Sequence, residues 1–182
     1  MTIRDYWRIT VALWLIVLPC VGFAGELSDL QRKAENGEVT AQFNLGVMYN
    51  TGQGVPQDDK QAVKWWRLTA DQGYAGAQYT LGVMYYEGQG VPQDDKQAVK
   101  WWRLAADQGD AEAQYNLGVM YANGQGVPQD YAQAHMWLNL AAANGNEKAK
   151  GNRDIVAGLM TGEQIAEAQK LAREWMAAHP DE

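Results

Sequence analysis

The chain has 182 residues, of which 47% are apolar and 20% are charged, a balance typical of a folded protein and not of a disordered one. Its formal net charge of −7 argues against nucleic acid and against anionic membranes as partners, because both are bound through clustered Lys and Arg.

The first 24 residues differ from the rest of the chain. Arg4 and Arg8 precede an apolar stretch from Ile9 to Ala24, after which the chain turns polar. A basic start, a short apolar run and small residues at its end are typical of a secretory signal peptide. We predict cleavage after Ala24 and export, to the periplasm or as a secreted protein. An uncleaved amino-terminal anchor is the alternative, although the run is shorter than the roughly 20 residues that span a bilayer.

One phrase then recurs along the chain. "GQGVPQDDKQAVKWWRL" stands at 52–68 and again at 88–104, and a degraded copy, "GQGVPQDYAQAHMWLNL", begins at Gly124. At a period of 36 residues the first two units agree at 29 of 36 positions. Such a period predicts an all-α solenoid of antiparallel helix pairs. The predicted divisions are a signal peptide at 1–24, an amino-terminal capping helix (half a repeat) at 25–39, repeats at 40–75, 76–111 and 112–147, and a C-terminal helix pair or cap at 148–182.

Each unit divides into two predicted helices. In "AQFNLGVMY" the apolar residues fall at helical spacing, and Gly52 gives a stop signal. Asp58, followed three residues later by Gln61, has the spacing of a capping box and predicts a second helix from about residue 59 to residue 72. The pairs Asp94/Gln97 and Asp130/Gln133 repeat this spacing.

Two neighbouring registers of the second helix carry large side chains. Trp65, Trp101 and Trp137 share one register, and the next holds Trp66, Trp102 and Leu138. Because each unit of a solenoid meets an identical neighbour, we expect indole rings to fill the gaps between units. A glycine also recurs inside the first helix, where it costs about 1 kcal/mol relative to Ala. We expect this missing side chain to admit a ring from the adjacent helix; the glycines are Gly46, Gly82 and Gly118.

The C-terminal segment is predicted to be a cap. Thr161 and Gln164 have capping-box spacing, and the helix that follows has one apolar stripe and one charged side. A terminal unit with a polar outer face is what a solenoid requires.

The pattern "AxxxLGxxYxxGxGVPxDxxxAxxWxxxAAxxG" resembles the Sel-1-like repeat, a relative of the tetratricopeptide repeat. Within the first unit Leu45, Gly46, Tyr49, Trp65 and Gly73 match it, and so do their equivalents 36 and 72 residues later. The resemblance implies a right-handed superhelix with a concave face, in proteins that typically hold other proteins or peptides. Some cysteine-rich secreted members are described as binding or hydrolysing beta-lactams. This chain has one cysteine, Cys20, inside the predicted signal peptide, so that branch is a poor match.

The sequence offers little material for a reaction centre. Ser28 is the only serine, and the two histidines are His135 and His179. Three helix pairs separate Ser28 from His135, which excludes a Ser-His-Asp triad in a rigid array. Asp58 and Asp59 could be read as calcium ligands, but capping accounts for Asp58 and one carboxylate pair supplies too few oxygens. We therefore expect no catalytic residues, no metal and no cofactor.

The remaining candidate site is a second stripe on the first helices, opposite the stripe predicted to be core. We predict that part of it lines the concave groove and contacts a partner through aromatic rings and side-chain hydrogen-bonding groups. Packing of Phe43, Tyr79 and Tyr115 on the preceding unit is the alternative. The predicted partner-binding residues are Phe43, Asn44, Val47, Asn50, Tyr79, Thr80, Val83, Tyr86, Tyr115, Asn116 and Val119.

Together these features predict a monomeric, noncatalytic, exported scaffold that binds a protein or peptide on its concave face. The alternative is a secreted repeat protein that hydrolyses beta-lactams or binds the cell wall. We predict that the chain binds no nucleic acid and has no contact with a membrane apart from a possible uncleaved anchor.

Overall fold

The computed structural model describes residues 25–180, so the predicted signal peptide and its cleavage site lie outside the described residues. All the regular structure in this range is helical. Residues 25–35 are helical and precede eight labelled helices. Their bounds are α2 Val39–Thr51, α3 Asp59–Asp71, α4 Ala75–Glu87, α5 Asp95–Ala106, α6 Ala111–Asn123, α7 Tyr131–Ala143, α8 Glu147–Gly158 and α9 Gly162–Ala178.

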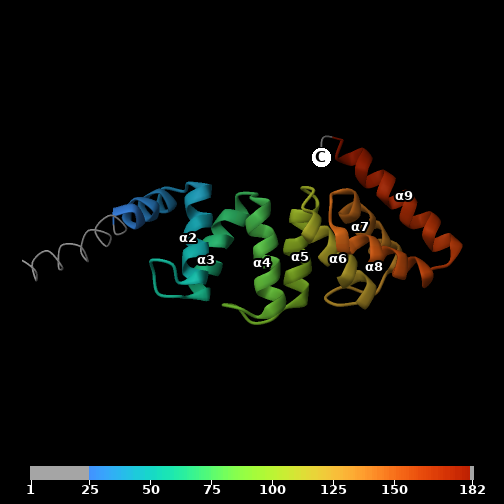
Figure 1. Ribbon diagram of the computed structural model, residues 1–182, viewed down its shortest axis with the longest axis horizontal. Helices are drawn as coiled ribbons and strands as arrows, with labels where there is room; N and C mark the ends of the chain where they lie inside the picture. The colour runs from blue at the N-terminus through green and yellow to red at the C-terminus, as the bar shows by residue number, and fades with distance from the viewer. Residues whose placement is uncertain (1–24, 181–182) are drawn as a thin grey trace, which may run out of the picture.

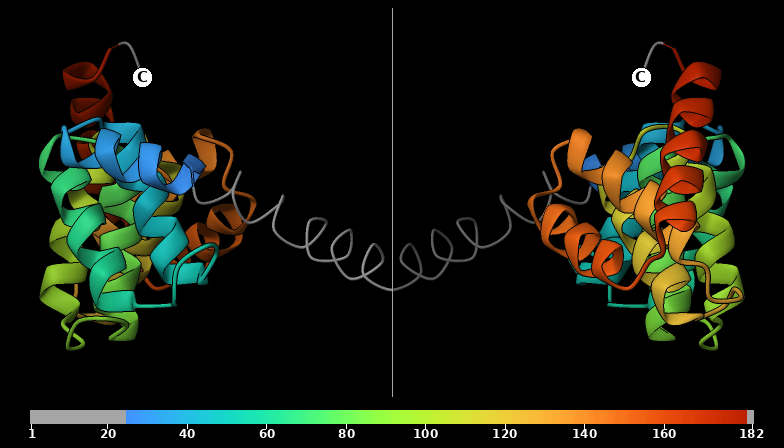
Figure 2. Two further views of the ribbon diagram at one scale, coloured as in Figure 1. Left: turned by 90° about the vertical axis from the view of Figure 1, so that its left-hand side faces the viewer. Right: turned by 90° about the vertical axis from the view of Figure 1, so that its right-hand side faces the viewer.

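The helices α2 to α8 follow one another in chain order along one axis of the molecule, and α9 runs back and packs on α7 (Figure 1). Each repeat contributes a first helix (α2, α4, α6) and a second helix (α3, α5, α7), and the two pack against each other as a hairpin. Seen along the axis, the hairpins lie one behind another (Figure 2). The predicted all-α helical-repeat solenoid is therefore confirmed.

Aspartates begin the second helices, as the sequence predicts. The Asp58 carboxylate accepts hydrogen bonds from the backbone amides of Lys60 (3.0 Å) and Gln61 (3.1 Å). Asp94 and Asp130 do the same at α5 and α7. These bonds satisfy amides that have no partner within the helix, and they place a negative charge at the positive end of the helix dipole.

The two large-residue registers have different roles, which the sequence did not distinguish. Trp66 and Trp102 are 3% exposed and pack inside their own hairpin, where each indole Nε1 donates to a backbone carbonyl of the first helix at 3.2 Å. The other register fills the gap between hairpins. Trp101 joins the core formed by α3 and α4, and Trp137 joins the core formed by α5 and α6. The prediction that indoles fill the gaps between units therefore holds for the register of Trp101.

A buried glutamine in each first helix fixes one repeat against the one before it. The Gln78 side chain donates to the carbonyl of Ala70 in α3 at 3.1 Å, and its own carbonyl accepts from Gln108 in the turn after α5 at 2.7 Å. Gln42 and Gln114 make the equivalent bonds. We call this series of bonds the glutamine ladder. The sequence analysis did not predict it, although the pair "AQ" recurs at 41–42, 77–78 and 113–114.

The loops of the second and third hairpins also touch the preceding repeat. A β-carbon on Gly90 would lie 2.4 Å from the carbonyl oxygen of Asp59, and one on Gly126 would lie equally close to that of Asp95. Both glycines have positive φ, 69° and 67°. Glycine is therefore required here both by the backbone conformation and by the close approach of the neighbouring helix.

The C-terminal helix closes the array. Thr161 and Gln164 form the predicted capping box at the start of α9. Ala172, Leu171 and Trp175 pack against the core that contains Trp137, and the two indoles meet edge to face with their ring centroids 6.2 Å apart. The predicted apolar stripe of α9 therefore contacts the last full repeat.

Candidate functional site

The predicted stripe lies on α2, α4 and α6, and its aromatic rings are only partly buried. Phe43, Tyr79 and Tyr115 are all of intermediate exposure, so a partner can reach them. Their known contacts are to their own repeat and the following one. Phe43 packs on Trp66 and on Tyr74, with its ring centroid 5.1 Å from that of Tyr74.

The second and third repeats bring most of the stripe together. A pocket of about 300 Å³ opens between α4 and α6. We call it the α4–α6 pocket. Its lining includes six of the eleven predicted residues, Tyr79, Val83, Tyr86, Tyr115, Asn116 and Val119, together with Glu87, Trp102 and Met120. The last three were not predicted; Trp102 reaches the pocket because its ring lies over Gly82.

The other five predicted residues do not line this pocket, and two of them use their polar groups internally. The Thr80 hydroxyl donates to the Gly76 carbonyl of its own helix at 2.7 Å. The Asn50 amide donates to the Asp59 carboxylate at 3.1 Å. Asn44 is exposed on α2. Phe43 and Val47 pack against the core formed by α3 and α4.

A side-chain amide from the following repeat holds the Tyr115 hydroxyl in place. The Asn152 amide of α8 donates to the Tyr115 hydroxyl at 3.1 Å. This ring at the pocket is therefore held by a fixed partner, which lowers the entropy lost when a ligand binds.

The α4–α6 pocket lies in a negative field. Burial raises the pKa of Tyr79 above its ordinary value, and the carboxylates of Glu112, Asp110 and Glu87 raise it further by disfavouring the tyrosinate. No Lys, Arg or His is among the residues that line the pocket. The charge at this surface is thus carried by carboxylates.

Tyr86 of repeat two occupies the position that Asn50 has in repeat one. In repeat one, Asn50 pairs with Asp59 across the hairpin. In repeat two, the equivalent residues are Tyr86 and Asp95, and Asp95 Oδ1 is buried with no hydrogen-bond partner among the described residues. Tyr86 instead packs its ring 5.6 Å from that of Trp102 and is 39% exposed. The chain therefore forgoes an internal hydrogen bond and displays an aromatic ring at the pocket.

The groups considered for chemistry are far apart in the array. Ser28 hydrogen bonds to the Gly25 carbonyl near the start of the described chain, whereas His135 lies in α7. His179 follows α9 and stacks on Trp175 with ring centroids 4.1 Å apart. Over residues 25–180, no three His, Cys, Asp or Glu side chains gather as a metal site would require.

Stacked helical hairpins with a recurrent capping aspartate and a glycine–indole contact define a helical-repeat protein of the tetratricopeptide-like kind. The family model described as Sel1 repeat matches residues 39–74, 75–110 and 111–146. The chain therefore belongs to the Sel1 repeat family. Proteins of this family are typically noncatalytic scaffolds for interaction with other proteins.

Solved structures agree with this assignment. The chain is similar to c5321, a protective antigen of uropathogenic Escherichia coli, with 46% identity and a TM-score of 0.65 over 66% of this chain, but it spans only 26% of that protein. A Sel1 repeat protein from Oxalobacter formigenes shows 43% identity and a TM-score of 0.66 over 71% of this chain and 97% of its own. Helicobacter pylori cysteine rich protein B shares the fold at 21% identity, with a TM-score of 0.54 over 69% of this chain and 95% of its own.

No match was found among the curated proteins. None of the helices in residues 25–180 combines the length and the apolar character needed to span a bilayer.

Proposed function

We propose that this chain is a noncatalytic, exported scaffold that binds a protein or peptide partner along the face formed by α2, α4 and α6. The observation that carries the proposal is the α4–α6 pocket. Aromatic rings, among them Tyr115 held by Asn152, meet there at a solvent-accessible surface, which is the composition found where proteins concentrate binding energy.

The variation between repeats supports the same face. Repeats one and two differ at seven positions. Three of these lie in the stripe on the first helices, Phe43/Tyr79, Asn44/Thr80 and Asn50/Tyr86, and a fourth, Thr51/Glu87, is next to it. The other three differences are Thr40/Gly76, the buried pair Thr69/Ala105 and the N-cap pair Tyr74/Asp110, and the loop between the two helices is unchanged. A concentration of differences on one accessible face is expected where a partner is recognised.

Site-specific photo-crosslinking tests the binding face. A benzophenone amino acid replaces Val119, which lines the pocket, and in a matched control it replaces Lys64, which is exposed on α3. In an envelope extract we expect a discrete crosslinked protein from position 119, none from position 64, and loss of the product when Tyr115→Ala is added. Equal labelling from both positions, or none from either, would refute the proposed face.

Export and the absence of catalysis are tested separately. A fusion of residues 1–30 to alkaline phosphatase should be active, because that reporter folds only after translocation, and Leu15→Arg should abolish the activity by breaking the apolar run. The purified chain should not hydrolyse a chromogenic beta-lactam. Hydrolysis that persists through repurification would favour the enzymatic alternative. Size-exclusion chromatography with light scattering should give the mass of a monomer.

A further inference from the structure

The α4–α6 pocket has the composition of a site for a positively charged side chain. Tyr79, Tyr86, Tyr115 and Trp102 present aromatic surface to it, and Glu87 stands at its edge. Aromatic faces attract cations through the negative electrostatic potential over the ring, and a neighbouring carboxylate adds to that attraction. An inference about the charge of the occupant rests on the proposed function, because it concerns the same site.

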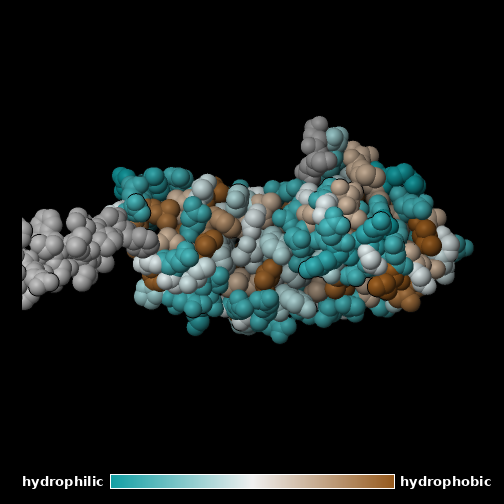
Figure 3. Space-filling view, in the orientation of Figure 1, coloured by the Kyte–Doolittle hydropathy of each residue, from teal (hydrophilic) through white to brown (hydrophobic). Residues whose placement is uncertain are grey.

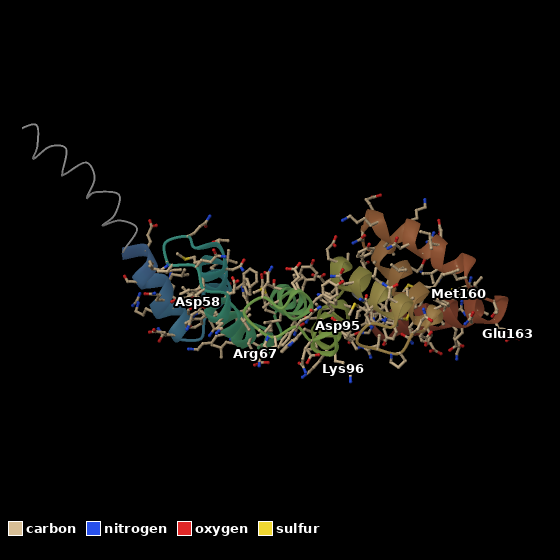
Figure 4. All side chains as sticks on the ribbon, turned by 90° about the horizontal axis from the view of Figure 1, so that it is seen from below. Asp58, Arg67, Asp95, Lys96, Met160 and Glu163 are labelled. Carbon is tan, nitrogen blue, oxygen red and sulfur yellow. The ribbon has the colours of Figure 1, made fainter. Side chains whose placement is uncertain are left out.

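The charged residues of the repeats are divided by helix. The first helices α2, α4 and α6 carry two charged side chains between them, Glu87 and Glu112, and both are acidic. The cations of repeats one and two all lie on the second helices α3 and α5: Lys60, Lys64, Arg67, Lys96, Lys100 and Arg103. Arg67 and Lys96 are seen along one edge of the array in Figure 4. A basic peptide is therefore attracted by the face formed by the first helices and not by the face formed by the second helices.

The carboxylates near the pocket are not neutralised by the protein. Within residues 25–180, none of Glu87, Asp110 and Glu112 forms an ion pair. Two of them are held by neutral donors. Asp110 accepts from the Ala113 amide at 2.8 Å, and Glu112 accepts from the Asn146 side chain at 3.0 Å. Their negative charge thus remains available to a ligand in a fixed position.

The substitution at position 86 is most simply explained by binding. Asn at this position would allow the bond that Asn50 gives to Asp59, whereas Tyr86 leaves Asp95 Oδ1 buried without a partner in the described chain. Departures from local stability are expected at functional sites, where the residue is retained for what it binds. The ring gained at this position is one of those that line the pocket, and the adjacent change from Thr51 to Glu87 adds a carboxylate to the same edge.

We propose that the α4–α6 pocket receives a lysine or arginine side chain of the bound peptide, held over the rings of Tyr79, Tyr86 and Tyr115 and beside the carboxylate of Glu87. On the side of the molecule shown in Figure 3, polar residues divide the apolar surface into separate patches. Charge and aromatic contact together select the occupant.

A random peptide library displayed on phage tests the inference on the whole chain. Enriched sequences with one recurrent Lys or Arg support it. Replacing that residue by norleucine or Gln should weaken binding about tenfold at low salt. Affinity should also fall as NaCl is raised from about 0.05 M to about 0.5 M, because screening weakens the attraction of exposed charges.

The chain supplies its own matched variant. Tyr86→Asn with Glu87→Thr places the residues of repeat one in repeat two, where they are known to fit the same backbone. This variant should be at least as resistant to thermal unfolding as the wild type, since Asn can donate to Asp95, yet it should bind the enriched basic peptides about tenfold more weakly or worse. Lys100→Gln on α5 is the control for a charge change elsewhere, and its affinity should not fall.

The outcomes separate the two proposals. Enrichment of peptides without a basic residue, or basic peptides that bind Tyr86→Asn/Glu87→Thr as well as the wild type, would overturn the cationic site while leaving peptide binding intact. Failure of the wild type to enrich any sequence would count against both.

Discussion

The indole of Trp102 occupies the space that a side chain on Gly82 would need. A β-carbon added to Gly82 would lie 2.3 Å from both Cδ1 and Nε1 of this ring. In repeat one, a β-carbon added to Gly46 would lie 2.5 Å from Nε1 of Trp66. The glycine costs helix stability by itself, but it allows α4 and α5 to approach closely enough for the ring to be enclosed and for Nε1 to reach the Tyr79 carbonyl. The expectation that the recurrent glycine admits a ring from the adjacent helix is therefore confirmed at Gly46 and Gly82. At Gly118 it is wrong, because the side chain that fills the space is Leu138, whose Cγ would lie 2.6 Å from an added β-carbon.

Gly82→Ala should destabilise the protein even though Ala is the better helix former. The methyl group would meet a rigid, enclosed ring, so either the indole or the helix must move, and overpacking of this kind costs about 1–3 kcal/mol. Urea unfolding followed by circular dichroism measures the loss.

Gly151→Ala in α8 is the matched control. It makes the same substitution within a helix where nothing lies within 4 Å of the added carbon. Here the propensity gain should prevail and stabilise the protein by up to about 1 kcal/mol. A stabilised Gly82→Ala variant, or two variants that shift in the same direction, would be inconsistent with the packing described.

The repeat period, the helix bounds and the caps could be predicted because each depends on residues close in sequence. Asp58 caps the helix that follows it, and Gly52 ends the helix before it. The roles of Trp65 and Trp66 could not be separated in the same way. Adjacent residues on a helix point about 100° apart, and which direction faces the same hairpin and which faces the next depends on how the hairpins stack.

The candidate site was predicted at the level of a helix face but not of individual contacts. Tyr86, Tyr115 and Asn116 line the α4–α6 pocket, whereas Thr80, which has the same register as Asn116, turns its hydroxyl to its own helix. A short hydroxyl-bearing side chain can reach the carbonyl four residues earlier, whereas Asn116 lines the pocket. Rotamer choices of this kind are decided by the packed neighbours and are not visible in one sequence.

Gln78→Met should weaken the connection between repeats one and two. Methionine has a similar length and volume but can make neither the bond to the Ala70 carbonyl nor the bond from Gln108. Each such bond contributes about 0.5–1.5 kcal/mol net, so we expect a loss of about 1–3 kcal/mol in the free energy of unfolding. Gln108→Met keeps the bond from Gln78 to Ala70 and removes the bond to Gln78 together with the bond to the Leu104 carbonyl; because Gln108 is exposed and water can replace its partners, this variant should cost less. An unchanged Gln78→Met variant would show that the glutamine ladder does not stabilise the stack.

His135 makes stability depend on pH. It occupies the register of the buried Val63 and Val99, and burial, followed by the charge of Arg153, lowers its pKa below the ordinary 6.5. The unfolded chain therefore takes up the proton first as the pH falls. The contribution of neutral His135 is complete above about pH 7 and is lost as the pH drops through 6.5 and below.

His135→Val should remove this dependence. Between pH 7.5 and pH 5.5, the melting temperature of the wild type should fall more steeply than that of the variant, with the variant more stable at the acid end. The range ends at about pH 5.5 so that Asp and Glu, which titrate near pH 4, contribute little. Parallel profiles for the two proteins would mean that the environment of His135 does not lower its pKa.

Deletion of residues 76–111 should leave a protein that still folds cooperatively. The cut joins Ala75 to Glu112 and recreates the junction of Ala111 with Glu112, so α6 meets α3 through the same kinds of side chain that α4 presents now. Its helical content should persist, and the denaturant m-value should fall roughly in proportion to the residues removed, by about a fifth to a quarter. Because the shortened chain lacks Tyr79, Tyr86 and Glu87, it should also lose affinity for basic peptides. A broad, noncooperative melt would contradict the independent stacking of hairpins, whereas a cooperative melt with undiminished peptide affinity would place the binding site outside the α4–α6 pocket.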